Sequence, residues 1–477
     1  MMGRLESAQE RFFYDFRLDD IVPPDHLVRK IDAVLDLSWL HGELAPYYSH
    51  TGRPSIDPEL MMRMLIIGYV FAVRAERQLC SEVQVNLAYR WFCRLGVEDA
   101  IPDHSVFSRA RHERFCESEA FRLVFETVVG ACLKEGLVGG ESFSVDASLI
   151  KADVNPVKRV PGDAPIDWPE PEQATRAVTE YLSALDQDCP EDRPEDRPED
   201  RPEDRPEDRP EDRKSGKRKT PPKAVSLTDP QAAWVAKRKV RPIFAYDANY
   251  LIDNKLGVIV DAEGTCANRV EENRVCVSMV ERVMTRFDLK PKRLAADTAY
   301  GSSDTLKALM DRGIEPHIPV WDKSKRTDGT FSRADFSYDA ERDVYTCPGG
   351  NILKTTGNAH SDNTLRYRAS TRDCGPCPLK DRCCPNTPQR KIPRDINESV
   401  RDRVRALAGT PAFKRSRDER KKVEMAFAHM KRIFKLDRLR LRGLSGARDE
   451  VLLTATAQNL RKLARYVCRP PPTLKTA

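Results

Sequence analysis

The segment FAYDANYLIDNKLGVIVDAEG, residues 244–264, sets the fold prediction for this chain. It holds two apolar runs of strand length, joined by a tight Asp253-Asn254 turn. Upstream, ESFSVDASLI (141–150) alternates as a strand does. Downstream, the patterns predict a helix over 267–287, a strand over RLAADTAY (293–300), a helix over SSDTLKALMDRG (302–313) and a fifth short strand over EPHIPV (315–320). This order predicts an α/β fold of the mixed, α+β kind, in which helices flank one mixed sheet.

Helical patterns precede and follow this sheet. The region 1–135 predicts an all-α domain, in which PELMMRMLIIGYVFAV (58–73) is too apolar for a surface helix and is expected to be buried. SEVQVNLAYRWFCRLG (81–96) has apolar residues at helical spacing. Residues 411–443 and 447–467 predict two further helices. The sheet domain is therefore expected to comprise 141–320 and 396–467.

Two insertions interrupt the predicted sheet domain. The first, 151–240, contains six tandem Pro-Glu-Asp-Arg copies at 190–213, followed by KSGKRKTPPK. The repeat has no apolar residue to bury and a proline at every fourth place, which predicts a disordered spacer. A role as an acidic interaction tail is the alternative. The second insertion, 321–395, carries a cysteine cluster.

Bulk composition excludes some classes of protein. With 40% hydrophobic and 32% charged residues, the 477-residue chain is typical of a globular protein. It has no apolar run long enough to cross a bilayer, and its N-terminus lacks the apolar core of a signal peptide. We therefore expect a cytoplasmic protein without a membrane partner. In that reducing compartment, thirteen cysteines do not predict a disulfide framework.

Two strand acids stand among apolar neighbours. Asp146 lies inside the first predicted strand, and Asp297 ends the fourth. A buried carboxylate is costly unless it binds something, so both are candidate metal ligands. Asp247 and Asp261 fit less well, because each lies close to a turn. Two or three acids that converge from different elements would suit the paired divalent ions of phosphodiester chemistry.

A third acid lies in the basic C-terminal helix. Glu424 is flanked by apolar residues, and helical spacing puts Arg420 and Lys431 on its side. The alternative is an ordinary ion pair between Arg420 and Glu424. Residues 411–443 contain twelve Lys or Arg and four Asp or Glu, an excess typical of a surface that contacts phosphates. The combination favours a metal site that also grips a phosphate backbone.

A helical pair in the N-terminal region is a candidate DNA reader. In IPDHSVFSRARHERF (101–115), Asp103 or Ser105 can cap a helix that bears Arg109, Arg111 and Arg114. Helix, short turn and basic helix are compatible with a helix-turn-helix. The alternative is a basic, solvated face of a small helical bundle.

The cysteines of the second insertion have zinc-like spacing. Cys347 is followed by Pro-Gly-Gly, then come Cys374-x-x-Cys377 and the pair Cys383-Cys384. Four thiolates are available if one of that pair takes part. The alternative is a set of buried thiols without a metal. The sequence therefore predicts a possible structural Zn²⁺ site at Cys347, Cys374, Cys377 and Cys383 or Cys384.

At these positions the chain resembles bacterial insertion-sequence transposases of the DDE type. In the N-terminal region the resemblance is to an InsH-type transposase domain. It is carried by Ile21–Arg29, Gly52–Pro58, Tyr89-Arg90-Trp91-Phe92 and Pro102-Asp103-His104-Ser105. In the rest it is to an RNase H-like catalytic domain, and Asp146, Asp297 with Tyr300, and Glu424 with Arg420 and Lys431 fit that pattern. Arg417 stands where many members carry a tyrosine.

The resemblance implies a reaction, cofactors and partners. It implies cleavage at terminal inverted repeats and transfer of the freed strand into target DNA, with Mg²⁺ or Mn²⁺ as two ions held by Asp146, Asp297 and Glu424. Arg420, Lys431, Arg417, Arg109 and Arg111 would contact double-stranded DNA. Because two ends must be brought together, a homodimer or larger assembly is expected, associated with the nucleoid when bound. The alternatives are an inactive DNA-binding regulator derived from a transposase, and a nuclease without strand transfer.

Overall fold

The structure is a computed structural model that describes residues 17–48, 51, 55–115, 118–170, 172–188, 222–236, 241–267, 269–320, 328–360 and 363–468. Three sequence features lie outside these residues. They are the N-terminal segment 1–16 examined for a leader, the residues Gly52–Pro54 of one family motif, and the Pro-Glu-Asp-Arg repeat with most of the basic run after it.

The N-terminal region is helical, which confirms the prediction. Its elements are α1 (Leu18–Ile21), α2 (Leu27–Asp32), α3 (Leu40–Leu44), η1 (Ala45–Tyr47), α4 (Pro58–Val70), α5 (Glu76–Val85), α6 (Leu87–Phe92), α7 (His104–Ala110), η2 (Arg111–Phe115) and α8 (Ala120–Lys134). α4 is buried over most of its length, as its composition predicts. Asp103 caps α7 by accepting from the Ser105 N–H. The single helix expected over 81–96 is instead two, because Asn86 ends α5 and caps α6.

A mixed sheet lies at the centre of the molecule, and all five predicted strands belong to it. They are β1 (Ser142–Lys151), β5 (Ile243–Asp253), β6 (Ile259–Cys266), β7 (Arg293–Ala295) and β8 (Glu315–His317). β1 pairs antiparallel with β5 and parallel with β7. β5 pairs antiparallel with β6, and β7 pairs parallel with β8. The mixed α/β class is therefore confirmed.

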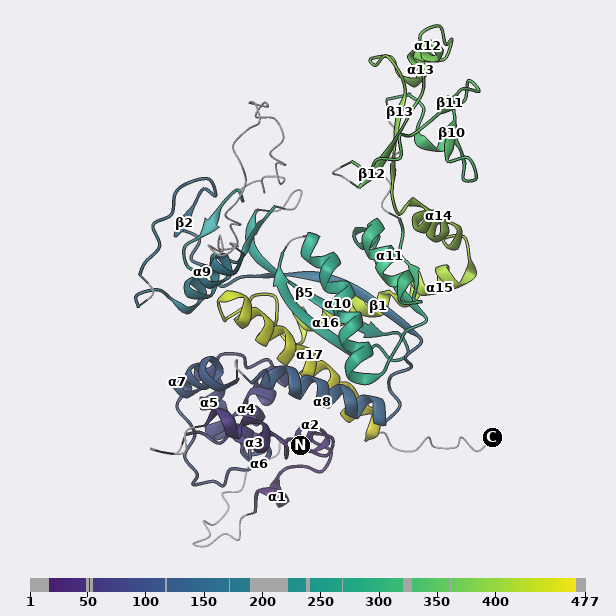
Figure 1. The fold of residues 1–477 in the computed structure, drawn as a ribbon. Coiled ribbons are helices and arrows are strands. Elements are labelled where there is room, and N and C mark those ends of the chain that lie inside the picture. The colour runs from purple at the N-terminus through teal and green to yellow at the C-terminus, as the bar shows by residue number, and fades with distance from the viewer. Residues whose placement is uncertain are drawn as a thin grey trace, which may run out of the picture.

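Helices cover both faces of the sheet (Figure 1). α10 (Arg269–Phe287) and α11 (Ser303–Asp311) contribute to one core, together with the inward residues Val145, Leu251 and Val260. α16 (Lys421–Arg432) and α17 (Gly443–Val467) contribute to the other, together with Tyr246 and Tyr250. α14 (Glu398–Leu407) and α15 (Pro411–Glu419) precede α16 along the chain.

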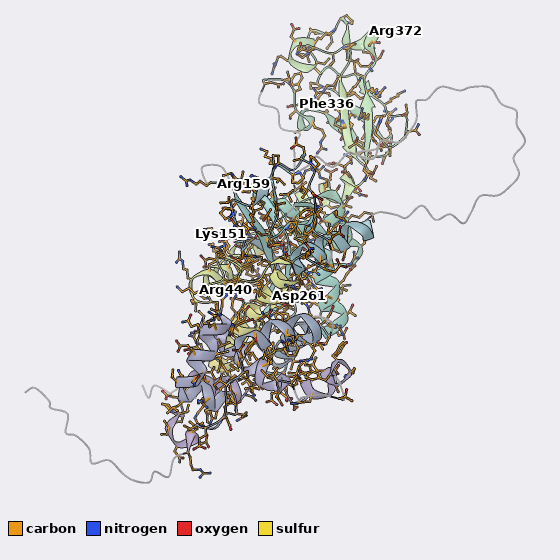
Figure 2. All side chains as sticks on the ribbon, turned by 90° about the vertical axis from the view of Figure 1, so that its left-hand side faces the viewer. Lys151, Arg159, Asp261, Phe336, Arg372 and Arg440 are labelled. Carbon is orange, nitrogen blue, oxygen red and sulfur yellow. The ribbon has the colours of Figure 1, made fainter. Side chains whose placement is uncertain are left out.

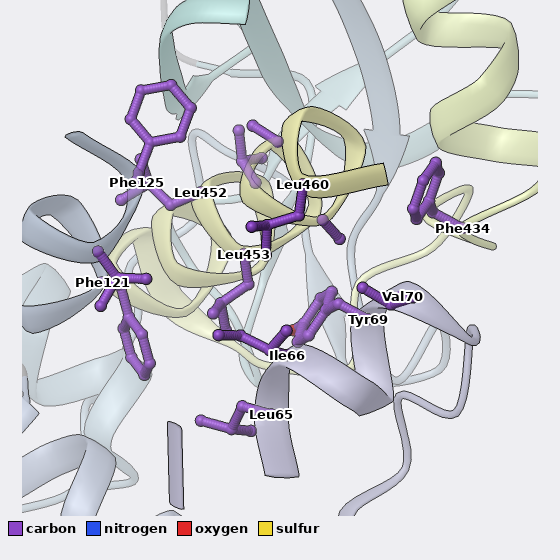
Figure 3. Packing of buried hydrophobic residues seen from close by; sticks show 14 of the residues in the cluster. Leu65, Ile66, Tyr69, Val70, Phe121, Phe125, Phe434, Leu452, Leu453 and Leu460 are labelled. Atoms are coloured by element: carbon purple, nitrogen blue, oxygen red, sulfur yellow. The ribbon is translucent and has the colours of Figure 1, made fainter. Parts of the chain in front are cut away.

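The N-terminal helices share a core with the sheet. α17 lies between them, as Figure 1 shows, and its Leu452, Leu453 and Leu460 belong to the same apolar cluster as Ile66 of α4 and Phe125 of α8 (Figure 3). Burying apolar side chains from both parts in one cluster couples their stability. The boundary at residue 135 therefore separates two parts of the sequence, but the apolar core is continuous across it.

The described residues of the first insertion include four short elements, one of which joins the sheet. They are β2 (Arg159–Val160), α9 (Arg176–Asp188), β3 (Val225–Ser226) and β4 (Ala233–Val235). β4 pairs antiparallel with the first residues of β5, and so adds a sixth strand that the sequence did not predict. β2 and β3 pair with each other in a separate small sheet.

The second insertion forms a small unit that stands away from the main sheet (Figure 1); Phe336 and Arg372 mark it in Figure 2. Its elements are η4 (Arg333–Asp335), β9 (Ser337–Asp339), β10 (Val344–Thr346), β11 (Ile352–Leu353), β12 (Thr364–Arg368), α12 (Thr371–Cys374), α13 (Lys380–Cys383) and β13 (Lys391–Asp395). We call residues 328–396 the cysteine unit. Its core is small, and three of its nine buried apolar residues are cysteines.

The C-terminal basic segment departs from its prediction. One helix was expected over 411–443, but α15 ends at Glu419, α16 begins at Lys421, and Arg420 lies at their junction. Residues beyond Arg432 leave the helix before α17 begins. No helix in the described part of the chain combines the length and apolar character needed to cross a membrane.

Candidate active site

Strand register places Asp146 and Asp297 next to each other. β1 and β7 are parallel neighbours, and their last paired residues are Ser144 and Ala295. Asp146 and Asp297 each lie two residues beyond that pair in the same direction. Asp146 lies within β1, whereas Asp297 follows the end of β7, so the strand expected over 293–300 is shorter than predicted and Asp297 caps the turn after it. The charge of Asp297 acts on the Asp146 carboxyl, so the two acids are near neighbours.

Asp146 is held by its strand with little exposure to solvent. Its side chain is 21% exposed, and its Oδ1 accepts a hydrogen bond of 2.9 Å from the Ala147 N–H. The pKa of Asp146 is raised to about 6, mainly by burial and also by the charges of Asp297 and Glu424, against the lowering by the Ala147 N–H and Arg420. These mutual effects link all three acids electrostatically.

Asp297 is fixed by the turn that follows β7. Its Oδ1 accepts a hydrogen bond of 2.8 Å from the Ala299 N–H, and so caps the 3-10 turn η3 (Thr298–Tyr300). Tyr300 at the end of this turn is buried. A capped turn restricts the position of the carboxylate, because its oxygen already has one fixed donor.

Arg420 connects the strand acid to the helix acid. Its guanidinium lies 3.8 Å from Asp146 Oδ2 and 3.4 Å from Glu424 Oε1. The expected Arg420–Glu424 pair therefore forms, and it extends to Asp146. Lys431, two turns after Glu424 along α16, donates a hydrogen bond of 2.9 Å to the Leu149 carbonyl of β1.

Helix α16 is anchored by its apolar side. Val423, Phe427 and Met430 are buried, and the Phe427 ring stacks on Tyr250 of β5 with centroids 4.8 Å apart. Glu424 was expected on this apolar side, but its side chain is 56% exposed. The reason is that the buried stripe follows Val423, Phe427 and Met430, one position away from Glu424. The carboxylate consequently faces solvent beside the strands.

The donor set suits a hard divalent cation better than a soft one. Asp146, Asp297 and Glu424 offer only carboxylate oxygens, the ligands that Mg²⁺ and Mn²⁺ prefer. Among the residues that the structure describes, however, no three His, Cys, Asp or Glu side chains are grouped closely enough to hold a metal ion. The three acids therefore fit a divalent cation in the type of ligand atom they offer and in their common location.

Sequence analysis missed the residues that hold α15. Ser416 Oγ and His317 Nδ1 are 2.7 Å apart, and His317 Nε2 lies 2.7 Å from Glu315 Oε1. Ser416 and His317 are both buried, so this chain of contacts ties α15 to β8 rather than facing a substrate. Glu419 adds a second tie by accepting from Ser142 of β1 at 3.0 Å. The one sequence signal for these contacts is Ser416 itself, a polar residue that shares the buried side of α15 with Phe413.

Two family comparisons match the chain. Residues 16–113 match the family described as Transposase domain (DUF772), and residues 346–464 match the family described as Transposase DDE domain. The second range includes Glu424 and spans most of the cysteine unit, whereas Asp146 and Asp297 lie outside both. This chain is similar to insertion-sequence transposases of the DDE type. Both matches support a transposase.

Comparisons with individual proteins add little. A solved structure, the cryo-EM structure of the piggyBac transposase synaptic complex with hairpin DNA, matches with 10% sequence identity and a TM-score of 0.32. The match covers 94% of this chain and 80% of that chain. A likeness at this level carries no argument about the site. No curated protein matches significantly.

The predicted DNA-contact arginines divide into exposed and buried groups. Arg109 and Arg417 are exposed on α7 and α15. Arg111 is buried, with its Nη1 2.5 Å from Glu76 Oε1 and its Nε 3.8 Å from Asp449 Oδ2. This corrects the expectation for Arg111, because a buried, ion-paired guanidinium has no face free for DNA.

A buried ion network also escaped the sequence analysis. Asp261 of β6 contacts Arg122 of α8 at 2.5 Å and Arg282 of α10 at 2.8 Å. Glu263 contacts the same two arginines at 3.0 and 2.9 Å. Asp261 was weighed as a weaker metal candidate, and its carboxylate is instead fully engaged by cations. The network links the N-terminal helices to both layers of the sheet domain.

The cysteines of the cysteine unit surround one small pocket. Cys347, Cys374, Cys377, Cys383 and Cys384 all line it. The Asn351 N–H donates to Cys347 Sγ at 3.3 Å, and the thiols Cys374 and Cys383 both interact with Cys384. Burial raises the pKa of Cys383 to about 11. As placed, these thiols are among the described residues in which no metal-holding group of three occurs.

Proposed function

We propose that this chain is a transposase that cleaves DNA at the terminal inverted repeats of its element and joins the freed ends to target DNA. One observation supports the proposal: Asp146 lies in β1, Asp297 follows the parallel neighbour β7, and Arg420 contacts both Asp146 and Glu424. Three acids from three elements beside a cation suit phosphodiester chemistry. The similarity to DDE transposases at both ends of the chain supports the same reaction.

The sheet order supports an RNase H-like catalytic domain. Without the short β4 of the insertion, which also pairs with β5, the strands run in the order β6-β5-β1-β7-β8, and β5 alone is antiparallel to the other four. β1, which carries Asp146, and β7, which Asp297 follows, are both inside this order, where helices cover the sheet on each face. The proposed catalytic domain comprises 141–320 and 396–467, with the helical region 1–135 packed on it through α17.

Each residue has a proposed role. Asp146 and Asp297 would hold two divalent ions, Mg²⁺ or Mn²⁺, and Glu424 would hold one of them. Bound ions of this kind lower the pKa of the attacking water or hydroxyl and stabilise the leaving oxygen. Arg420 keeps Asp146 and Glu424 together and, once they bind cations, can contact a phosphate oxygen.

Double-stranded DNA is the proposed partner. Twelve cations against four acids over residues 411–443 give this part of the chain the charge that a phosphate backbone requires. Arg417 and Arg109, both exposed, and Lys431 are the proposed contacts outside the metal site. Because two element ends must be brought together, the active form is proposed to be a homodimer or a larger assembly.

A cleavage assay tests this function. Purified protein and its Asp297→Ala variant are incubated with Mg²⁺ and a labelled duplex that carries the ends of the element. Strand cleavage and joined products with the parent, and neither with the variant, support a transposase. Cleavage without joined products would favour a nuclease. Equal cleavage by both proteins would contradict the site assignment, and DNA binding without cleavage by the parent would favour a regulator.

We also propose a structural Zn²⁺ ion in the cysteine unit, held by Cys347, Cys374, Cys377 and one of Cys383 or Cys384. The support is that all five thiols line one pocket in a unit with a small apolar core. Units of this size commonly depend on a bound metal for stability. Zinc content of the purified protein should fall by about one equivalent in Cys374→Ser and stay unchanged in the control Cys468→Ser. Equal zinc content in all three proteins would refute the site.

A further inference from the structure

A second basic surface lies on the side of α16 that does not carry Glu424. It is a groove bounded by α16, the C-terminal half of α17 and the β5–β6 turn. The groove is lined by Leu137, Lys255, Leu256, Gly257, Ile259, Lys422, Met425, Ala426, His429, Ile433, Phe434, Gln458, Arg461, Lys462, Arg465 and Tyr466. We call these residues the α16–α17 groove. Figure 1 shows α16 beside α17 in this part of the molecule.

The groove has cations and no acid. Five lysines and arginines line it, together with His429, whereas no Asp or Glu does. The chain as a whole has 80 Lys and Arg against 74 Asp and Glu, so a surface of this size with one sign of charge is unusual for it. An electrostatic potential of one sign over a concave surface attracts counter-charged ligands.

These cations are neutralised by no carboxylate in the described part of the chain. Lys255 donates to the Gly136 carbonyl at 2.8 Å, and Lys422 and Lys462 donate to the carbonyls of Asn254 and Gly257. Carbonyl acceptors orient an ammonium group but do not neutralise its charge as a carboxylate would. Three of the five cations are therefore positioned by carbonyls, and none of the five forms an ion pair with a carboxylate of the described residues.

Nearby groups do not cancel this charge. Asp253 is the acid whose charge acts on Lys462, but it is buried outside the groove, and its oxygens accept from the N–H groups of Gly139, Gly140 and Lys255. Burial lowers the pKa of Lys462 to about 8, and the positive charge of Lys422 contributes. A bound anion would relieve both effects.

We propose that the α16–α17 groove is a second binding surface for the phosphate backbone of double-stranded DNA, separate from the carboxylate site. Uncompensated cations from two helices and a turn fit a row of phosphates. Because α16 carries Glu424 on one side and the groove on another, DNA bound in the groove would hold that helix in place. The proposal rests on the proposed function only in taking DNA as the ligand.

Fluorescence anisotropy with a labelled duplex of arbitrary sequence tests the proposal. Binding by the full chain is measured between about 50 and 200 mM KCl. Lys255→Gln/Arg465→Gln changes two exposed groove cations, and Arg342→Gln/Arg403→Gln changes two exposed cations elsewhere as a matched control. The slope of log K against log salt should fall by about 2 in the groove variant and less in the control.

The possible outcomes separate the two proposals. Equal slopes for parent, groove variant and control would overturn the groove proposal, as would a groove variant that keeps its slope but changes its oligomeric mass in light scattering. The latter result would make the groove an interface between copies. Asp297→Ala should lose cleavage while keeping the parental slope. Failure of cleavage in the parent would therefore count against the proposed function and leave the binding result intact. Arg461→Gln, tested alone, checks the result with an independent variant.

Discussion

Asp146 occupies a position where an ionised carboxylate is unfavourable for folding, and the same position is part of the proposed metal site. Its carboxylate is largely buried, and burial raises its pKa from 3.8 to about 6. Between these two pH values, the Asp146 carboxyl is therefore protonated in the folded protein but ionised in the unfolded chain. Stability from this group is present at low pH and is lost as pH rises through about 6. A carboxylate that is buried despite this loss of stability is typical of a site that binds a ligand.

Asp146→Asn should stabilise the protein while abolishing cleavage. At neutral pH the amide removes a desolvated charge, so the free energy of unfolding should rise by up to about 3 kcal/mol. Cleavage should fall by about a thousandfold or more, because a metal ligand is lost. Chemical denaturation at pH 7.5 and the cleavage assay measure the two effects. Lower stability of the variant at that pH would contradict the account of Asp146.

Arg420→Gln should move the acidic limb of the pH–rate profile to higher pH. The Arg420 charge lowers the pKa of Asp146, so its removal leaves burial and the charges of Asp297 and Glu424 to raise that pKa further. Cleavage rates between pH 5 and pH 8 are the measurement. Arg415→Gln, an exposed cation on α15, is the control and should keep the parental profile. A shift to lower pH in Arg420→Gln would be inconsistent with this explanation.

At the scale of single residues, sequence patterns placed Asp146 in its strand, because strand alternation is a local property, whereas Asp297, expected to end a strand, caps the turn after β7. Glu424 was assigned to the right helix but to the wrong side of it, since the buried stripe is decided by packing on Tyr250. Arg111 could not be assessed locally, because Asp449 is far from it in the chain. Long-range ion pairs leave no periodic signal in a sequence.

At the scale of elements, the junction between α15 and α16 decides where α16, which carries Glu424, points. Arg420 lies between the two helices, as the C-cap of α15 and the N-cap of α16. The Ser416–His317 contact holds α15 against β8 just before this junction. The pattern over 411–443 predicted a continuous helix. The residues around the junction all favour helix, so the sequence does not reveal that the helix changes direction there.

Ser416→Ala tests this anchoring. It leaves His317 Nδ1 without its buried partner, which should cost roughly 1–3 kcal/mol of stability. Cleavage should also fall, because α15 no longer fixes the start of α16. Ser278→Ala is the control, since Ser278 is exposed and its hydroxyl donates to the Val275 carbonyl within its own helix, and it should change stability by less than about 0.5 kcal/mol. Parental activity and stability in Ser416→Ala would contradict the proposed anchoring.

At the scale of the whole molecule, α17 joins the N-terminal helices to the sheet. Its buried leucines contact both, so one apolar cluster crosses the division at residue 135 (Figure 3). The sequence predicted the helical region, the mixed sheet and their order along the chain. It could not predict the shared core, because an amphipathic helix does not reveal which two surfaces it will bury.

Leu453→Ala should weaken both parts together. The leucine is buried, and its truncation should cost about 2–5 kcal/mol. Unfolding of parent and variant should give coincident transitions for probes of the N-terminal helices and of the sheet, both at lower denaturant in the variant. Two transitions, of which only one moves, would show that the parts fold independently.

The central claim is that Asp146, Asp297 and Glu424 form one divalent-metal site. Calorimetric titration of the DNA-bound protein with Mn²⁺ measures it most directly, with Asp146→Asn, Asp297→Asn and Glu424→Gln compared with the exposed-acid control Asp418→Asn. The account predicts that each of the three variants loses Mn²⁺ affinity by about tenfold or more, while Asp418→Asn binds like the parent. Parental Mn²⁺ binding by any two of the three variants would contradict a shared site.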